Sequence, residues 1–270
     1  MAHISYISSL LIFLVIAFSS RSQEAKLPET LRQAQQNVCA IKILTAEGQA
    51  SSLGCGVVIK SKVNQQSVYF VATAWHIVSG LISEDGRTAT VHVFDQNGYF
   101  YKTGALTSKN VIWWNRSMDA ALMVLPANIE PGEPLPQNYE SPGLASLKII
   151  GDPEWGQEIY MFGYRWINEN KFIDIVKKGI LSVGTTELPG YENHLVYLID
   201  NMANKGMSGG LAFTSDGTGI GIISSYVYES GDRYLNSDDL SVCLPLTFFF
   251  ESMNVVINKG GEAILRIVNP

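Results

Sequence analysis

Three short segments of the sequence combine residue types that can carry out nucleophilic chemistry. His76 directly follows an apolar, strand-like run with small residues just before it. Asp119 comes immediately before another strongly apolar run, and Ser208 lies in the glycine-rich segment 206–210. A serine nucleophile needs a base to take its proton, and the base needs a carboxylate to orient it. Together, the three segments predict a serine hydrolase.

Each segment on its own has a simpler explanation. A single histidine is more often structural, an aspartate before a strand often ends a turn, and a serine among glycines can belong to an ordinary turn. A glycine-rich turn can, however, expose the hydroxyl of Ser208 and aim backbone N–H groups at a developing oxyanion. The combination of the three is therefore much more specific than any one of them.

The order of the three residues along the chain distinguishes between hydrolase classes. The segment 206–210 (GMSGG) matches the G-x-S-x-G turn of α/β-hydrolases, but those enzymes place a histidine after the serine, and none follows Ser208. The subtilisin order needs an aspartate before the histidine, and none lies between Gln23 and His76. That order would require His92, in an alternating strand run, or His194, in a loop-like segment, as the base. The order His, Asp, Ser remains.

These residues must be positioned by strands, because short apolar or alternating runs separated by turn residues dominate the chain. A segment rich in Pro, Gly and Glu, 126–146, divides the runs into two groups and predicts a linker. A closing helix is expected over 248–256. The predicted strands are 38–44, 54–60, 68–74, 90–94 and 120–125 before the linker, and 158–162, 172–183, 195–200, 211–214, 219–225 and 240–244 after it.

Several of these segments together resemble the trypsin-like serine peptidases, especially their HtrA-like branch. GCGVVI at 54–59 followed by VATAWH at 71–76 resembles the family's G-S-G-x-x-I and T-A-x-H segments. DAAL at 119–122 resembles D-I-A-L, and GMSGG at 206–210 resembles G-x-S-G-G. GIGIIS at 219–224 resembles the later strand that lines the substrate cleft.

The resemblance covers residues 37–250 and implies an all-β fold of two six-stranded antiparallel β-barrels, with a short C-terminal helix. One barrel would span about 37–125 and the other about 147–250, with 251–270 as an extension.

The resemblance also implies an endopeptidase that forms an acyl-enzyme without a cofactor or metal. His76 would be the base, Asp119 its orienting acid and Ser208 the nucleophile. The amides of Gly206 and Ser208 would form the oxyanion hole. The expected substrate-binding residues are Met202, Ser224, Ser225 and Tyr226.

The sequence departs from the family pattern at three positions. Trp75 replaces a small residue before the histidine, so a bulky ring is expected beside the base. Met207 stands where digestive members carry an aspartate that binds a freed N-terminus, which argues against that activation switch. Cys55 stands where the HtrA-like branch has serine. The alternative reading is a catalytically silent protein of this fold that binds peptides or partners.

The first 22 residues predict export. The unbroken apolar run 10–18 is followed by small and polar residues, which is typical of a signal peptide cleaved after Ser22. An uncleaved N-terminal anchor is the alternative, and no later stretch predicts a membrane span. Both readings place the domain outside the cytoplasm, secreted or periplasmic. Residues 23–36 form a polar lead-in.

Charge and cysteine usage narrow the partners. The formal net charge is −6 with no long run of either sign, so a polypeptide is the expected partner and nucleic acid is not. The three cysteines are scattered, which argues against a metal site. Cys39 and Cys55 lie on neighbouring predicted strands, so we expect a disulfide between them. Three buried thiols are the alternative.

Overall fold

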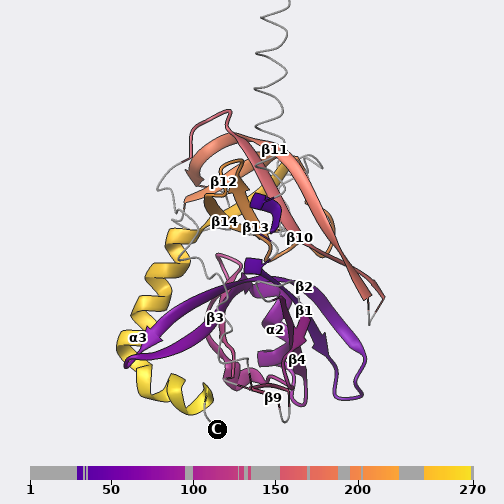
Figure 1. The fold of residues 1–270 in the computed structure, drawn as a ribbon, viewed down its shortest axis with the longest axis vertical. Helices are drawn as coiled ribbons and strands as arrows, with labels where there is room; N and C mark the ends of the chain where they lie inside the picture. Colours follow the sequence, from indigo (N-terminus) through magenta and orange to yellow (C-terminus); the bar gives the residue numbers. More distant parts are fainter. Residues whose placement is uncertain are drawn as a thin grey trace, which may run out of the picture.

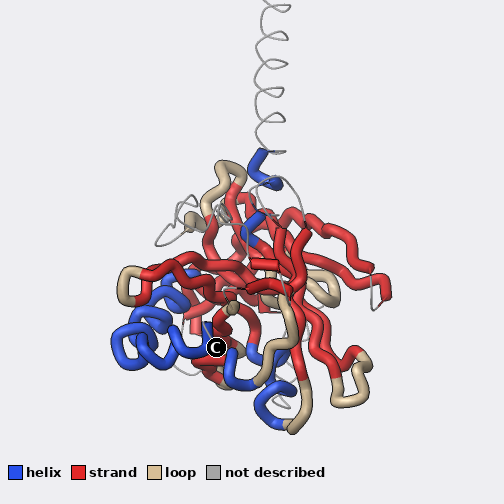
Figure 2. The backbone as a smooth tube through the Cα atoms, turned by 60° about the horizontal axis from the view of Figure 1, so that its bottom comes forward, coloured by secondary structure: helices blue, strands red, loops and turns tan. Residues whose placement is uncertain are grey.

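The computed structural model describes residues 29–32, 34, 36–94, 100–126, 128–130, 133–134, 153–168, 171–187, 195–201, 203–224 and 240–268. Two β-structures lie one above the other, and a long C-terminal helix runs along one side of the molecule (Figure 1). Strands make up both halves, with α3 on the outside (Figure 2). The predicted signal peptide 1–22 lies outside the described residues. Among the residues described, no helix is long and apolar enough to span a bilayer.

The N-terminal half is a seven-stranded antiparallel sheet in the order β5-β4-β1-β2-β3-β7-β6. A helix, α2 (Trp75–Ser83), follows β3, and a short 3-10 helix, η1 (Ser108–Asn110), precedes β6. The strands are β1 Val38–Leu44, β2 Ala50–Val63, β3 Gln66–Ala74, β4 Thr88–Phe94, β5 Phe100–Lys102, β6 Val111–Asn115 and β7 Ala120–Val124.

The C-terminal half is a closed six-stranded barrel in the order β10-β11-β12-β15-β14-β13. A two-stranded ribbon, β8 (Asn128–Glu130) and β9 (Glu133–Pro134), lies in the predicted linker. The barrel strands are β10 Glu158–Asn168, β11 Lys171–Glu187, β12 Leu195–Asp200, β13 Leu211–Thr214, β14 Gly219–Ser224 and β15 Leu240–Pro245.

Strand alternation divides the apolar side chains among three cores. On β3, Val71 faces the interior of the N-terminal sheet, whereas Phe70 and Ala72 on either side of it face a larger core shared by both halves. Met161 on β10 faces the interior of the C-terminal barrel. Because both faces of β3 are buried, its sequence is a nearly continuous apolar run. The shared core fixes the two halves against each other and positions what lies between them.

Helix α3 (Leu246–Val268) spans the two halves. It packs on β2, β6 and β7 of the first sheet and on β14 and β15 of the barrel. The helix is longer than the predicted segment 248–256. A kink at Gly260 does not end the packing, because Ile264 and Val268 beyond it are buried in the shared core.

The all-β, chymotrypsin-like fold is confirmed, but the first half differs from the expected six-stranded barrel. It is a seven-stranded sheet, and only the C-terminal half is a closed barrel. Two strands of the seven-stranded sheet were not expected: β5, which pairs with β4, and β6, which pairs with β7. The helix α2 was not expected. It begins where β3 ends, and Ile77, Val78 and Leu81 pack into the first sheet's core.

Candidate active site

His76 and Asp119 are brought together by the pairing of two neighbouring strands. Ala74 at the end of β3 lies opposite Ala120 at the start of β7. The chain enters α2 at Trp75, whose N–H donates to the Asp119 carbonyl at 3.0 Å. The backbone N–H of His76 donates to Asp119 Oδ1 at 2.9 Å. The strand register therefore places the imidazole and the carboxylate side by side.

The imidazole ring of His76 is oriented by the carboxylate. Nδ1 lies 2.8 Å from Asp119 Oδ2 and 3.0 Å from Oδ1. A carboxylate only accepts hydrogen bonds, so Nδ1 carries a hydrogen, and in the neutral ring Nε2 then keeps its lone pair. This is the tautomer that a general base requires.

Asp119 is buried, with 4% of its surface exposed, and its carboxylate is satisfied by hydrogen-bond donors. In addition to the two donors of His76, the hydroxyl of Ser224 on β14 donates to Oδ2 at 2.6 Å. A buried carboxylate without such donors would be costly. The φ of Asp119 is +50°, a left-handed conformation that aspartate tolerates better than most residues. The acid thus joins the N-terminal sheet to the C-terminal barrel.

Ser208 lies in a tight turn closed by backbone hydrogen bonds. Met207 N–H donates to Asn204 O at 2.9 Å, and Gly210 N–H donates to Met207 O at 2.8 Å. Neither of these bonds uses the N–H groups of Gly206 or Ser208, the predicted oxyanion donors. Gly206 has φ +96°, which glycine adopts without strain.

The Ser208 turn is held between the two halves of the molecule. Cys55 N–H on β2 donates to Ser208 O at 2.7 Å, and Gly209 N–H donates to Ile223 O on β14 at 2.7 Å. Gly209 has φ +83°, and a Cβ there would lie 1.9 Å from the Cys55 carbonyl oxygen. The same oxygen accepts the Thr73 hydroxyl at 2.6 Å. Only glycine fits this close approach.

A surface pocket of about 640 Å³ brings together residues of both halves, including His76, Ser208 and Gly206. Ser208 is 3% exposed, and 26% of the His76 side chain is exposed. The residues lining the pocket are Ala50, Ser51, Ser52, Leu53, His76, Ile77, Arg165, Trp166, Lys205, Gly206 and Ser208.

The Cys55 thiol contacts Gly206, which lines this pocket. Its Sγ accepts the Tyr164 N–H at 3.0 Å and donates to the Gly206 carbonyl at 3.2 Å. Complete burial raises the pKa of the thiol to about 12, so it is present as S–H and can donate. A side chain of the N-terminal sheet thus contacts the backbone of a predicted oxyanion residue.

The predicted disulfide between Cys39 and Cys55 is wrong. All three cysteines are free and buried. Cys39 lies opposite Gly56, and Cys55 lies opposite Ala40. Because successive side chains point to opposite faces of a sheet, Cys39 points into the first sheet's core and Cys55 into the shared core. Neighbouring strands alone were an insufficient criterion, since the register decides the face.

The remaining sequence predictions have different outcomes. Met202, Ser225 and Tyr226 lie outside the described residues. Ser224 is described as the donor to Asp119, and its part in substrate binding stays a prediction. The ring of Trp75 stacks on Trp114, with centroids 5.8 Å apart. The described residues hold no cluster of potential metal ligands.

Sequence reasoning missed two partners of the site. Nothing in the sequence marks Ser224 as the donor to Asp119, because the contact joins segments that are 105 positions apart. Cys55 differs from the serine that the HtrA-like branch has at this position. That difference marks the position, but it does not predict the contact with Gly206.

One comparison with known proteins identifies a family, and another supports the fold. Residues 54–222 match the family of the trypsin-like peptidase domain. Among solved structures, the chain is similar to one described as the crystal structure of Deg5, with a TM-score of 0.60 and 14% sequence identity. The similarity covers 84% of this chain and 92% of that one. A search of curated proteins finds no significant match.

Proposed function

This chain belongs to the trypsin-like peptidase family, and we propose that it is a serine endopeptidase acting through a covalent acyl-enzyme at Ser208. One observation carries the proposal. The Nδ1 of His76 lies 2.8 Å from the buried carboxylate of Asp119, and His76 lines the same pocket as Ser208. A nucleophile, a base and the base's orienting acid thus belong to one site.

In the first half of the reaction, Ser208 Oγ attacks the carbonyl carbon of the peptide bond and its proton passes to His76 Nε2. Asp119 stabilises the imidazolium that forms. The N–H groups of Gly206 and Ser208 donate to the oxyanion. The C–N bond then breaks, the imidazolium gives its proton to the leaving amine, and the acyl group stays on Ser208.

In the second half, a water molecule loses a proton to His76 and attacks the acyl carbon. The proton returns to Ser208 Oγ as the acid product leaves. The reaction uses groups of the chain and one water molecule, and needs no cofactor. We further propose that the enzyme is exported and cleaves polypeptides outside the cytoplasm, because the apolar run 10–18 is typical of a signal peptide.

The test compares casein cleavage by the wild type and Ser208→Ala. We expect the substitution to lower turnover by more than about a thousandfold, since only oxyanion and binding effects remain without the nucleophile. Equal thermal unfolding of the two proteins shows that the fold is kept. Comparable cleavage by both proteins contradicts the proposal.

A further inference from the structure

The pocket beside Ser208 has one wall from each half of the molecule. One wall is formed by Ala50–Leu53 at the start of β2, with His76 and Ile77 of α2. The other is formed by Arg165 and Trp166 of β10 and by the turn that carries Lys205, Gly206 and Ser208. No described residue of β14 or β15 lines it.

This arrangement identifies the part of the substrate that the pocket receives. The acyl segment, N-terminal to the scissile bond, is expected along β14 and the residues that follow it. The amine of the leaving segment, C-terminal to the scissile bond, takes its proton from His76 and must therefore lie next to that ring. The pocket lines the His76 side and excludes β14, so it receives the leaving segment.

The charged side chains of Arg165 and Lys205, which line this pocket, have the same sign. Arg165 and Lys205 are both exposed, and neither forms an ion pair with a described residue. A third cation, Arg87, donates to the hydroxyl of Ser51 at 3.3 Å but is ion-paired with Glu84. None of the described lining residues is a carboxylate. The whole chain is acidic, with a net charge of −6, so the lining of this pocket is opposite in sign to the chain as a whole.

We propose that Arg165 and Lys205 select substrates with acidic side chains in the first positions after the scissile bond. The inference rests on the proposed peptidase function and names its substrate class. Exposed charge pairs are individually weak, but a cleft lined by one sign of charge concentrates its field. Two such contacts are worth about a tenfold preference in kcat/KM.

The test uses the full-length chain as it is produced. A library of peptides from a digested proteome is cleaved, and the new termini are identified by mass spectrometry. Three quenched fluorescent peptides are then made with the best acyl segment, followed by Glu-Glu, Gln-Gln or Lys-Lys. We expect kcat/KM to be about tenfold higher for Glu-Glu than for Gln-Gln, and lowest for Lys-Lys. The preference should shrink on going from 50 mM to 500 mM NaCl.

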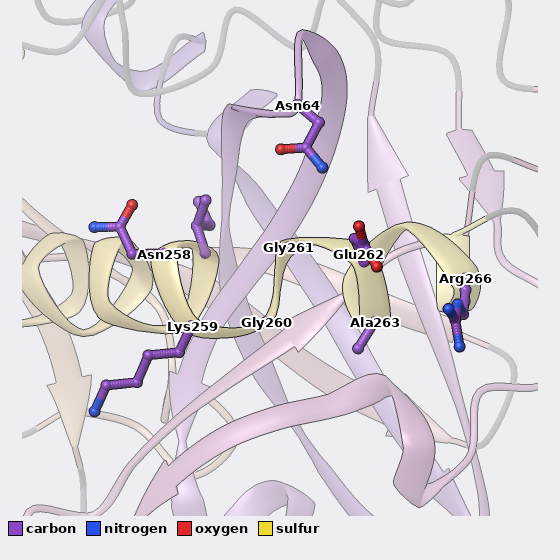
Figure 3. A pocket seen from close by; sticks show the side chains of 9 residues that line it. Asn64, Asn258, Lys259, Gly260, Gly261, Glu262, Ala263 and Arg266 are labelled. Carbon is purple, nitrogen blue, oxygen red and sulfur yellow. The ribbon is translucent and has the colours of Figure 1, made fainter.

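Variants that remove charge test whether Arg165 and Lys205 cause the preference for acidic peptides. Arg165→Gln and Lys205→Gln should each lower the ratio of Glu-Glu to Gln-Gln cleavage severalfold, and the double variant should abolish it. Because both peptides are cleaved by one protein, the ratio cancels any general loss of activity. The matched control is Lys259→Gln, which removes the same charge from a separate pocket at the α3 kink (Figure 3). This control should keep the wild-type ratio.

The outcomes separate the two proposals. Labelling of Ser208 by a fluorophosphonate in the same preparation shows that the nucleophile is active. A labelled preparation without a preference for acidic peptides overturns the role of Arg165 and Lys205 alone. The role of Arg165 and Lys205 is also overturned if Lys259→Gln lowers the ratio of Glu-Glu to Gln-Gln cleavage as much as the pocket variants do. A folded preparation without label contradicts the peptidase function itself.

Discussion

The base and the nucleophile of this site are held in place in different ways. His76 and Asp119 both come from the N-terminal half, and the pairing of Ala74 with Ala120 sets their contact. Ser208 comes from the C-terminal half, yet its carbonyl accepts a hydrogen bond from Cys55 of the N-terminal sheet. The first arrangement depends on one pair of neighbouring strands. The second depends on the contact between the two halves, which we call the seam.

This difference predicts which substitutions disturb the base and which disturb the nucleophile. Changes within β3 or β7 should affect the base, whereas changes at the seam should affect the nucleophile and the oxyanion donors. Ser224 links the two arrangements, because it donates from β14 to Asp119. Substitutions that act on one arrangement and spare the other therefore test the comparison.

The largest expected effect is at the base. Asp119→Asn keeps the shape of the side chain but presents an amide N–H₂ to His76, which favours the tautomer with hydrogen on Nε2. That ring cannot accept the Ser208 proton, so we expect kcat to fall by about ten-thousandfold. Peptide hydrolysis measures kcat, and circular dichroism checks the fold. A loss below tenfold in a folded variant contradicts the assigned role of Asp119.

The next largest effect is expected from a substitution that disturbs the seam directly. Gly209→Ala places a methyl group 1.9 Å from the Cys55 carbonyl oxygen, at φ +83°. The strain and the displaced backbone should lower the free energy of unfolding by about 3 kcal/mol or more. Gly260→Ala is the control, because nothing beyond its neighbouring helix residues lies within 4 Å of the added Cβ. Urea unfolding should show the control within about 1 kcal/mol of the wild type, and equal losses in both variants contradict the account.

A comparison of two cysteines sharpens the distinction. Cys55→Ala leaves the Tyr164 N–H and the Gly206 carbonyl without their thiol partner, and this should cost about 2 kcal/mol. Since Gly206 is a proposed oxyanion donor, kcat should also fall about tenfold, and Cys55→Ser should recover most of it. Cys39→Ala removes a thiol from the interior of the first sheet and should lower stability without lowering kcat. Equal kcat for the two alanine variants rules out the role given to Cys55.

The smallest effect concerns a second contact across the seam. His92 on β4 packs against Trp166 and Phe172 of the β10–β11 hairpin, with centroids 5.4 and 5.9 Å away. Burial, and then the charges of Lys102 and Lys42, lower the pKa of His92 from 6.5 to about 4. The unfolded chain takes up this proton at a higher pH than the folded chain. This contribution to stability is therefore complete above pH 6.5 and is lost as the pH falls toward 4.

His92→Phe keeps an aromatic ring but removes the titration. Between pH 7 and pH 4.5, the free energy of unfolding of the wild type should fall by about 2 kcal/mol more than that of the variant. Urea unfolding at the two pH values measures the difference. Parallel losses in the two proteins would mean that His92 does not titrate as its burial indicates.

The sequence predicted the parts of this molecule that depend on local pattern. The run Val38–Leu44 is β1, Leu195–Asp200 is β12, and Leu211–Thr214 is β13, because apolar alternation and flanking turns define them locally. His76 and Asp119 were found for the same reason, since each adjoins a strongly apolar strand.

Features that depend on register or on the seam were not predicted. The side to which Cys39 points follows from its pairing with Gly56, which composition does not reveal. The bond from Ser224 to Asp119 requires the two halves to be docked. Helix α3 was predicted too short, at 248–256, because tertiary packing of Ile264 continues the helix beyond the glycine pair at 260–261.

The most direct test of the central claim is covalent labelling of the protein by a fluorophosphonate, with the labelled peptide identified by mass spectrometry. We predict label on Ser208 in the wild type and none in Ser208→Ala. Such a result means that the nucleophile is activated by His76 and that the oxyanion donors are in place. Absence of label from the well-folded wild type contradicts the claim, and points to a protein of this fold that binds peptides without cleaving them.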